Sequence, residues 1–523
     1  MPNRGKKFPE SQESSATLQQ EDLVKPVRLR LNAIFNAAGS ISFYAVVFLI
    51  TPFVIERIGT QGWGIWQLVS STMGILLLLS LGLGSALNNE VARNYSHGSR
   101  ERLGSAINCS RAYFTLGSLL IIVIVFVGGS HLIRSLVGPV LFDTAYQTLL
   151  IAAVATAVAF VFEQFTSVVA GLQRYDLLGA FRLIQAGIFL LVVIILLRSN
   201  MQVQGFAAVM SLAPAVCGLL SWIYYRRIFP KKIRALRHIN VMHFKEMLWF
   251  GLNTLSYTIG LALLYQSMKF IASWRYGGVE SAGYIGLVIS LIMMLNVIFL
   301  PLITVLLPRI SSLMEAGNTQ AISKLFFRAF SVTGLVAIPS ITFLFIDADI
   351  ILNAWVGSVL SETVISELTK TLRIMLIGQG LYIVSLPCFF AMAGIREHRA
   401  LGLGMVFAGI FSIAASWLAG GSGAKLFVLG TVVSSCLGVL CLGLAIPVAI
   451  KRFSINIRTA IIDVGWLPLL ITLPGLLILL LLPRQESYMW TLGLDMVIFS
   501  IVVAPGFFYI FRSKIQQGTL TNL

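Results

Sequence analysis

The sequence predicts an all-α integral membrane protein of about 14 transmembrane helices, arranged as two six-helix lobes in parallel repeat plus a C-terminal helix pair. Hydrophobic residues make up 57% of the 523 residues and charged residues only 11%, and the mean hydropathy is +0.88. A soluble domain of this length could not cover its core with so little polar surface. Apolar runs long enough to cross the ~30 Å hydrocarbon core recur along almost the whole chain.

Each predicted span is an apolar run bounded by charged residues or by a turn that contains glycine. The first two flank a short turn, Glu56 to Gly62, so we expect them to be antiparallel neighbours. In chain order the predicted spans cover about 31–55, 63–87, 112–130, 147–171, 177–197, 204–225, 247–274, 281–308, 325–346, 369–394, 400–418, 426–450, 460–482 and 490–511.

The distribution of basic residues predicts the orientation. Roughly three quarters of the 38 Lys and Arg residues fall on one side of the spans, as the positive-inside rule describes, and in this count only Lys269 is left within a span. We therefore expect a multi-pass protein of the inner (cytoplasmic) membrane with both termini in the cytoplasm. The net charge of +17 then reflects orientation and contact with membrane lipids rather than binding of nucleic acid.

The chain is predicted to have five parts. They are a disordered cytoplasmic tail (1–30), an N-lobe of six spans (31–225), a basic cytoplasmic connection that acts as a hinge (226–246), a C-lobe of six spans (247–450), and an appended helix pair with a short cytoplasmic tail (451–523). The repeat rests on matching loops: Arg57-Ile58-Gly59 before Gly64 corresponds to Arg275-Tyr276-Gly277 before Gly283. Chance similarity among apolar helices is the alternative explanation.

Polar residues at helical spacing in several spans are typical of a transporter whose two lobes enclose a cavity. The alternative is helix–helix packing through small residues and interhelical hydrogen bonds. The candidate substrate-binding residues are Lys269, Gln266, Asn36, Gln67, Arg28, Arg30 and Arg309.

Two ionisable residues stand out because a charge at mid-membrane costs about 2.5–3.5 kcal/mol on insertion scales and therefore usually faces a partner or water. Lys269 would suit an anionic head group such as a diphosphate, although its place near the outer end of its span also allows snorkelling. Glu163 lies well inside its span and would suit ion coupling.

No catalytic constellation is visible. The sequence has no HExxH, GxSxG or GxxxxGK[ST] motif, and its five histidines are expected in scattered loops. The five cysteines lie in or beside apolar helices and are expected to pack in the core. We therefore expect no enzyme activity, no metal site and no cofactor, with energy drawn from an H⁺ or Na⁺ gradient or from the gradient of the substrate.

The most specific motifs lie in residues 51–87. They are Thr51-Pro52, Arg57-Ile58-Gly59, Gly62-Trp63-Gly64-Ile65-Trp66 and Ser80-Leu81-Gly82-Leu83-Gly84-Ser85-Ala86-Leu87. This stretch resembles the opening of the polysaccharide-biosynthesis flippases, the O-antigen and exopolysaccharide members of the multidrug/oligosaccharidyl-lipid/polysaccharide (MOP) exporter superfamily. One departure is Ser80, which stands where that family usually has an acidic residue.

The resemblance implies a flippase that carries undecaprenyl-diphosphate-linked oligosaccharide units across the cytoplasmic membrane by alternating access. It would act as a monomer, with polysaccharide polymerase or assembly proteins as partners. A drug or small-solute/cation antiporter of the same fold is the first alternative, although the first span has no carboxylate before Glu56. A membrane glycan polymerase or ligase is the second, and the short exterior loops argue against it.

Overall fold

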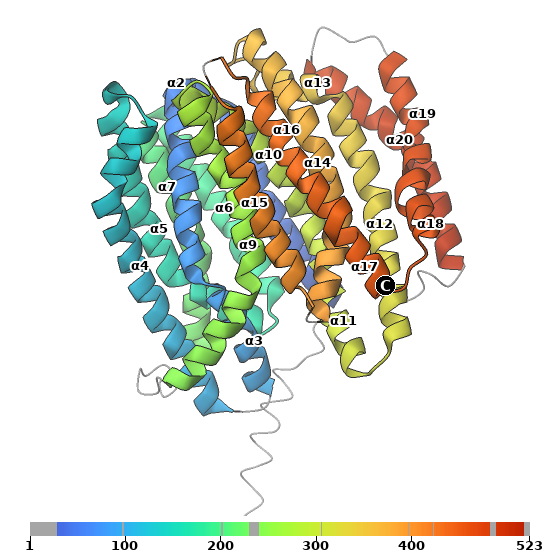
Figure 1. Ribbon diagram of the computed structural model, residues 1–523. Helices are drawn as coiled ribbons and strands as arrows, with labels where there is room; N and C mark the ends of the chain where they lie inside the picture. The colour runs from blue at the N-terminus through green and yellow to red at the C-terminus, as the bar shows by residue number, and fades with distance from the viewer. Residues whose placement is uncertain are drawn as a thin grey trace, which may run out of the picture.

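The computed structural model describes residues 29–96, 99–199, 202–229, 240–304, 306–395, 397–421, 423–481 and 488–516, which form long helices and no strand (Figure 1). Twelve helices in these ranges are long and apolar enough to cross a membrane, and a thirteenth is added if the bent pair Val241–Leu252 and Leu255–Arg275 is one span. The predicted all-α membrane architecture is therefore confirmed. The predicted tail, 1–30, lies almost wholly outside the described residues.

Helix α2 (Leu29–Leu76) contains both of the first two predicted spans as a hairpin. Its 48 residues would extend about 72 Å if straight, more than twice the hydrocarbon core. The backbone instead leaves the helix at Gly59 (φ 75°, ψ 169°), a region that favours glycine. The two legs run in opposite directions, as predicted. The labelled upper end of α2, where the two legs meet, lies at the top of Figure 1, and this side of the molecule is called the upper face below. Helix α3 lies toward the opposite side, which is called the lower face.

The second predicted span, 63–87, is not continuous. After α2 the chain makes a 3₁₀ turn over Leu77–Ser80, and Leu81 and Gly82 both have positive φ before α3 (Leu83–Ser96) begins. The break lies against α9, because a Cβ on Gly82 would stand 2.5 Å from the carbonyl oxygen of Gly251. Hydropathy alone could not separate this interrupted span from a straight one.

The next four helices pack beside the first leg of α2 and around α5. They are α4 (Arg100–Leu136), α5 (Phe142–Gly171), α6 (Tyr175–Arg198) and α7 (Val203–Ile228). Small residues allow close packing in this group: Gly39 of α2 meets Gly179 of α6, and Gly218 of α7 meets Phe162 of α5.

The second group starts with α9 (Val241–Arg275), which packs along α15. Its other members are α10 (Val279–Thr304), α11 (Leu306–Glu315), α12 (Thr319–Ile346), α13 (Ala348–Val356), α14 (Glu362–Gly394), α15 (Arg399–Ala419), α16 (Leu426–Leu440) and α17 (Ile446–Arg452). Helix α13 was not predicted. Its Trp355 donates a hydrogen bond of 2.8 Å to the carbonyl oxygen of Phe48 in α2 and stacks on that ring.

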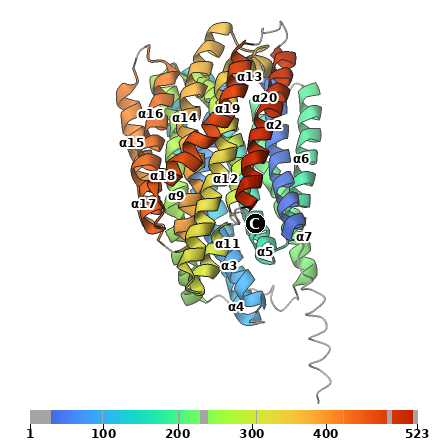
Figure 2. The same ribbon diagram turned by 90° about the vertical axis from the view of Figure 1, so that its right-hand side faces the viewer.

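The C-terminal segment lies at the right-hand edge of the molecule in Figure 1 and faces the viewer in Figure 2. It comprises α18 (Ile457–Ala460), α19 (Leu467–Leu481) and α20 (Tyr488–Gln516). This segment packs on α12, where Gly334 meets Val464 and Phe343 lies against Phe499. The division into lobes at 226–246 and the parallel repeat stay predictions, and residues 230–239 of that connection lie outside the described ranges.

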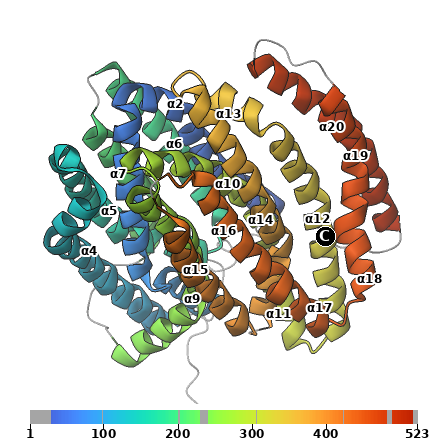
Figure 3. The same ribbon diagram turned by 45° about the horizontal axis from the view of Figure 1, so that its top comes forward.

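The second leg of α2 joins the two groups of helices (Figure 3). A Cβ on Gly64 would stand 2.1 Å from the carbonyl oxygen of Val279 in α10, and one on Gly286 would stand 2.5 Å from the amide carbon of Gln67. The hairpin therefore lies at the centre of the fold, with its second leg pressed against α9 and α10.

Candidate functional site

Lys269 lies near the upper end of α9 and is 7% exposed. Among the described residues, none forms a hydrogen bond or an ion pair with its ammonium group. Burial of an unpaired ammonium is costly, so such a group needs water or an anionic partner beside it. The structure thus places a buried basic group at this position, with no counter-charge among the described residues.

The two glutamines of the predicted site bind the hairpin to the second group of helices. Gln266, one turn from Lys269 on α9, accepts a hydrogen bond of 3.0 Å from the Ser71 hydroxyl, and its amide packs against Gly74. Gln67 is buried where α2 meets α10. These positions suit the packing alternative as well as a cavity wall, and substrate contact by either residue stays a prediction.

Of the other predicted binding residues, Arg30, Asn36 and Arg309 lie near the lower face. Arg30 and Asn36 belong to the first turns of α2, and Arg28 precedes the described residues. Arg309 is exposed on α11. The structure does not bring Arg309 and Lys269 together, because α9 places Lys269 close to the opposite face.

Glu163 is exposed although it lies in the middle of α5, and none of the described side chains pairs with its carboxylate. Above it on the same side of the helix, Ala152 and Thr156 are buried. The accessible part of this side of α5 therefore begins at Glu163 and faces the lower half of the molecule. An unpaired, accessible carboxylate within a span can take up and release a cation.

Arg182 lies inside the predicted span 177–197, and the structure places it two turns into α6. Its Nη1 donates a hydrogen bond of 2.8 Å to the Ser40 hydroxyl in the first leg of α2. Arg182 is therefore a basic group within a span, contrary to the expectation that Lys269 alone lies there.

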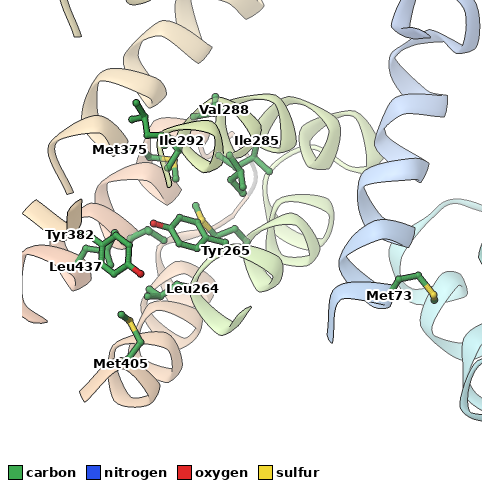
Figure 4. Close-up of a cluster of buried hydrophobic side chains, with 14 of the residues drawn as sticks. Met73, Leu264, Tyr265, Ile285, Val288, Ile292, Met375, Tyr382, Met405 and Leu437 are labelled. Atoms are coloured by element: carbon green, nitrogen blue, oxygen red, sulfur yellow. The ribbon is translucent and has the colours of Figure 1, made fainter. Parts of the chain in front are cut away.

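A buried hydrogen-bond chain crosses three helices of the second group. The Tyr265 hydroxyl on α9 donates to Gln379 Oε1 on α14 at 2.6 Å, and Gln379 Nε2 donates to Asn296 Oδ1 on α10 at 2.7 Å. Figure 4 shows Tyr265 and Tyr382 among the apolar side chains of this core, and the hydroxyls of Tyr257 and Tyr382 are also hydrogen-bonded. Sequence reasoning missed these residues, although the lone polar Asn296 and Gln379 in apolar runs were a usable signal.

The lower face has a polar cluster that links α3, α4 and α9, here called the lower clasp: Glu90, Asn94, Ser105 and His243. Glu90 Oε2 lies 3.0 Å from His243 Nε2, and His243 Nδ1 lies 3.4 Å from the Ser105 hydroxyl. The prediction that all histidines lie in loops is wrong here. Asn240 caps α9 by accepting from the backbone N–H groups of Met242 and His243, which places His243 in the first helical turn.

Electrostatics in the lower clasp favour the ionised form of Glu90. Burial acts to raise the pKa of the Glu90 carboxyl, but hydrogen bonds from His243 and Asn94 and the charge of Arg93 outweigh it, so the pKa lies below its ordinary value. A lowered carboxyl pKa contributes stability above the ordinary value of 4.5, and this contribution is lost as pH falls through the native value.

We expect the thermal midpoint of the wild-type protein in detergent to fall as the pH is lowered through 4.5 and below, and to fall less in Glu90→Gln. The amide that this substitution introduces does not titrate, so its contacts do not change with pH. Glu101→Gln, an exposed site on α4, is the control and should follow the wild-type curve. Identical curves for wild type and Glu90→Gln would contradict the role of the Glu90 charge.

Two cavities of about 550 Å³ each lie away from the predicted site residues. One opens on the upper face where α9, α10, α14 and α16 end or begin, and its wall includes Arg275, Glu367 and Lys425. The other is an apolar groove between α15 and α16. Within the described ranges, His, Cys, Asp and Glu side chains form no group of three or more that could hold a metal ion.

Comparison with known proteins gives a family and a fold. Residues 29–314, more than half of the chain, match the profile of a family described as "Polysaccharide biosynthesis protein". No curated protein sequence matches the chain. Among solved structures, the lipid II flippase MurJ in an inward closed conformation is similar, with a TM-score of 0.68 and 14% identity over 93% of this chain and 99% of that chain.

Two further structures show the same fold. One is the inward-facing conformation of a multidrug resistance MATE family transporter of the MOP superfamily, with a TM-score of 0.66 and 14% identity over 81% of this chain and 94% of that chain. The other is a MOP superfamily transporter from Pyrococcus furiosus, with a TM-score of 0.59 and 15% identity over 81% and 96%. At such identities the similarity establishes the architecture only.

Proposed function

Because the chain belongs to the family of polysaccharide biosynthesis proteins and has the fold of MOP superfamily transporters, we propose that it is a flippase for undecaprenyl-diphosphate-linked oligosaccharide units. The observation that carries the proposal is Lys269, a buried cation in a membrane span with no described counter-charge. A diphosphate would supply that charge while the sugar and the diphosphate cross the protein and the prenyl chain stays in lipid.

The proposed orientation follows the distribution of basic residues, with the upper face outside the cell and the lower face, where α2 begins and α20 ends, in the cytoplasm. On the upper face, Ser273 Oγ donates to the carbonyl of Leu136 at 2.7 Å and Trp274 Nε1 donates to that of Ser135 at 2.9 Å. These two bonds, here called the upper clasp, join α9 to the end of α4.

Alternating access requires that the two clasps open in turn. Each clasp consists of a few hydrogen bonds, and a typical one contributes only about 0.5–1.5 kcal/mol net. The two states can therefore lie within a few kcal/mol of each other, a difference that ligand binding is able to reverse. This energetic balance supports a rocking mechanism about the connection at 226–246.

A direct test is the location of lipid-linked glycan in a deletion strain. We expect the undecaprenyl-linked saccharide to accumulate on the inner leaflet and to be exported again when the wild-type gene is restored. Unchanged export in the deletion strain would reject the flippase. The same proposal includes polysaccharide polymerase or assembly proteins as partners that act on the exported glycan. It also includes a transporter that works as a monomer.

Glu163 is proposed to couple transport to an H⁺ or Na⁺ gradient, since it is a carboxylate in the middle of α5 with no described partner. In Glu163→Gln, transport should continue at a lower rate and no longer respond when an ionophore collapses the gradient. The matched control is Glu101→Gln, whose site lies near the start of α4. Full gradient dependence in Glu163→Gln would exclude this residue as the coupling group.

The same residue favours one alternative, an antiporter for drugs or small cations, because a carboxylate within a span can bind a cationic substrate. The two functions differ in what Lys269 should do. A buried cation assists an anionic diphosphate and repels a cationic drug. Drug efflux that improves when Lys269 is neutralised would support the antiporter.

A further inference from the structure

The upper-face cavity has a volume of about 550 Å³, within the range of about 300–1,000 Å³ typical of small-molecule sites. It is built by four segments far apart in the sequence: the end of α9, the start of α10, the first turns of α14 and the loop before α16. Gly277 and Gly278 form part of its wall, where the missing side chains leave the backbone open to a ligand.

Two charged groups of this wall, Arg275 and Glu367, are held in place by hydrogen bonds, and each has a further polar atom without a described partner. Arg275 Nη2 donates to the carbonyl of Gly420 at 2.6 Å, and the guanidinium lies 5.2 Å from the centre of the Trp417 ring. Its Nη1 is without a partner among the described residues. Glu367 Oε1 accepts from the backbone N–H of Leu426 at 2.6 Å, and its other oxygen has no partner in that same part of the chain. Lys425 is exposed beside them.

The cavity also has aromatic surface. Trp274, Tyr276 and Tyr284 belong to its wall, and the Tyr284 hydroxyl lies 3.4 Å from Glu280 Oε2. Aromatic rings combine a large apolar area with a polar edge. Pre-positioned donors, an acceptor and aromatic rings thus surround one water-facing space.

We propose that this cavity binds a saccharide on the outer side of the membrane. Each sugar hydroxyl can accept from Arg275 or Lys425 and donate to Glu367, and hydrogen bonds to charged groups are the stronger ones. The apolar faces of a sugar ring can pack on the aromatic side chains. An apolar ligand would leave the charges unpaired, and a small inorganic anion would meet the Glu367 carboxylate.

The site is connected to the upper clasp, because Ser273 and Trp274 belong to both. A saccharide in the cavity therefore favours the conformation in which these bonds to α4 are formed. This inference rests on the proposed function, in that the exported glycan would be the natural source of the saccharide. It adds a binding site that none of the predicted residues occupies.

The test is binding of soluble sugars to the full-length protein in lipid nanodiscs, measured by saturation-transfer difference NMR with glucose, N-acetylglucosamine and glucuronic acid. We expect at least one of these sugars to bind, with affinity lowered about tenfold in Glu367→Gln and in Lys425→Met, the effect of one charged hydrogen bond. Glu367→Gln keeps an acceptor for Leu426, so its thermal midpoint should match the wild type.

Lys370→Met is the matched control, an exposed lysine of α14 outside the cavity, and should bind like the wild type. No binding of any of the three sugars, or equal binding in all variants, would overturn the site. Inorganic phosphate binding that depends on Lys425, with no sugar binding, would show an anion site instead. If the purified protein binds a sugar but the deletion strain exports glycan normally, this site stands and only the flippase proposal is rejected.

Discussion

Replacing Lys269 by methionine should lower transport roughly 10–100-fold and leave the protein at least as stable as the wild type. The ammonium group is buried without a described partner, so no described contact offsets the free-energy cost of its desolvation. An apolar side chain of similar length removes that cost. A charged hydrogen bond to substrate is worth about 1.5–3 kcal/mol, which corresponds to a loss of roughly 10–100-fold in transport.

Surface glycan in a complemented deletion strain measures transport, and the thermal midpoint in detergent measures stability. Lys370→Met, on the exposed side of α14, should change neither. Lys269→Arg keeps the charge and should retain part of the transport. Normal surface glycan with Lys269→Met would remove this residue from the substrate site, whereas a lower midpoint would show that the ammonium has a stabilising partner.

Gly64→Ala should produce the largest loss of stability. A Cβ at this position would stand 2.1 Å from the carbonyl oxygen of Val279, and this oxygen belongs to the backbone of α10, which cannot move like a flexible side chain. Overpacking of this kind costs typically about 1–3 kcal/mol and occasionally more. Because this contact joins the two groups of helices, we expect a lower thermal midpoint together with reduced transport.

Gly128→Ala is the control, since a Cβ there would meet no atom within 4 Å. Alanine is favoured over glycine in a helix interior by about 1 kcal/mol, so this variant should be as stable as the wild type or more so. A Gly64→Ala protein with an unchanged midpoint would mean that α2 and α10 can separate without cost, and the close approach would then have no structural importance.

Much of the architecture was predictable because a bilayer demands long apolar helices and penalises their interruption. The hairpin at Gly59 followed from apolar runs on both sides of a short turn that contains glycine. Helix α13 was not predictable in this way, because its nine residues cannot span a membrane and pack through Trp355 on a partner more than 300 residues away.

The candidate site was only partly accessible to sequence reasoning. The cost of an intramembrane charge singled out Lys269 and Glu163, but hydropathy could not show that neither has a described partner. His243 was expected in a loop because the predicted span begins at 247, whereas α9 begins at Val241. Its contact with Glu90 joins residues 153 positions apart. The upper-face cavity depends on four separate segments and has no local signature. Such features arise from tertiary contacts, which residue spacing does not encode.

The meeting of Gly82 and Gly251 has a mechanical consequence. On one side of it the chain is broken at Leu81 and Gly82, and on the other α9 bends by 47° between Leu252 and Leu255. The interruption after α2 and the bend of α9 therefore lie beside each other. The segments below them, α3 and the first turns of α9, are joined through Glu90 and His243, so a change of backbone angle at either break would move both segments together.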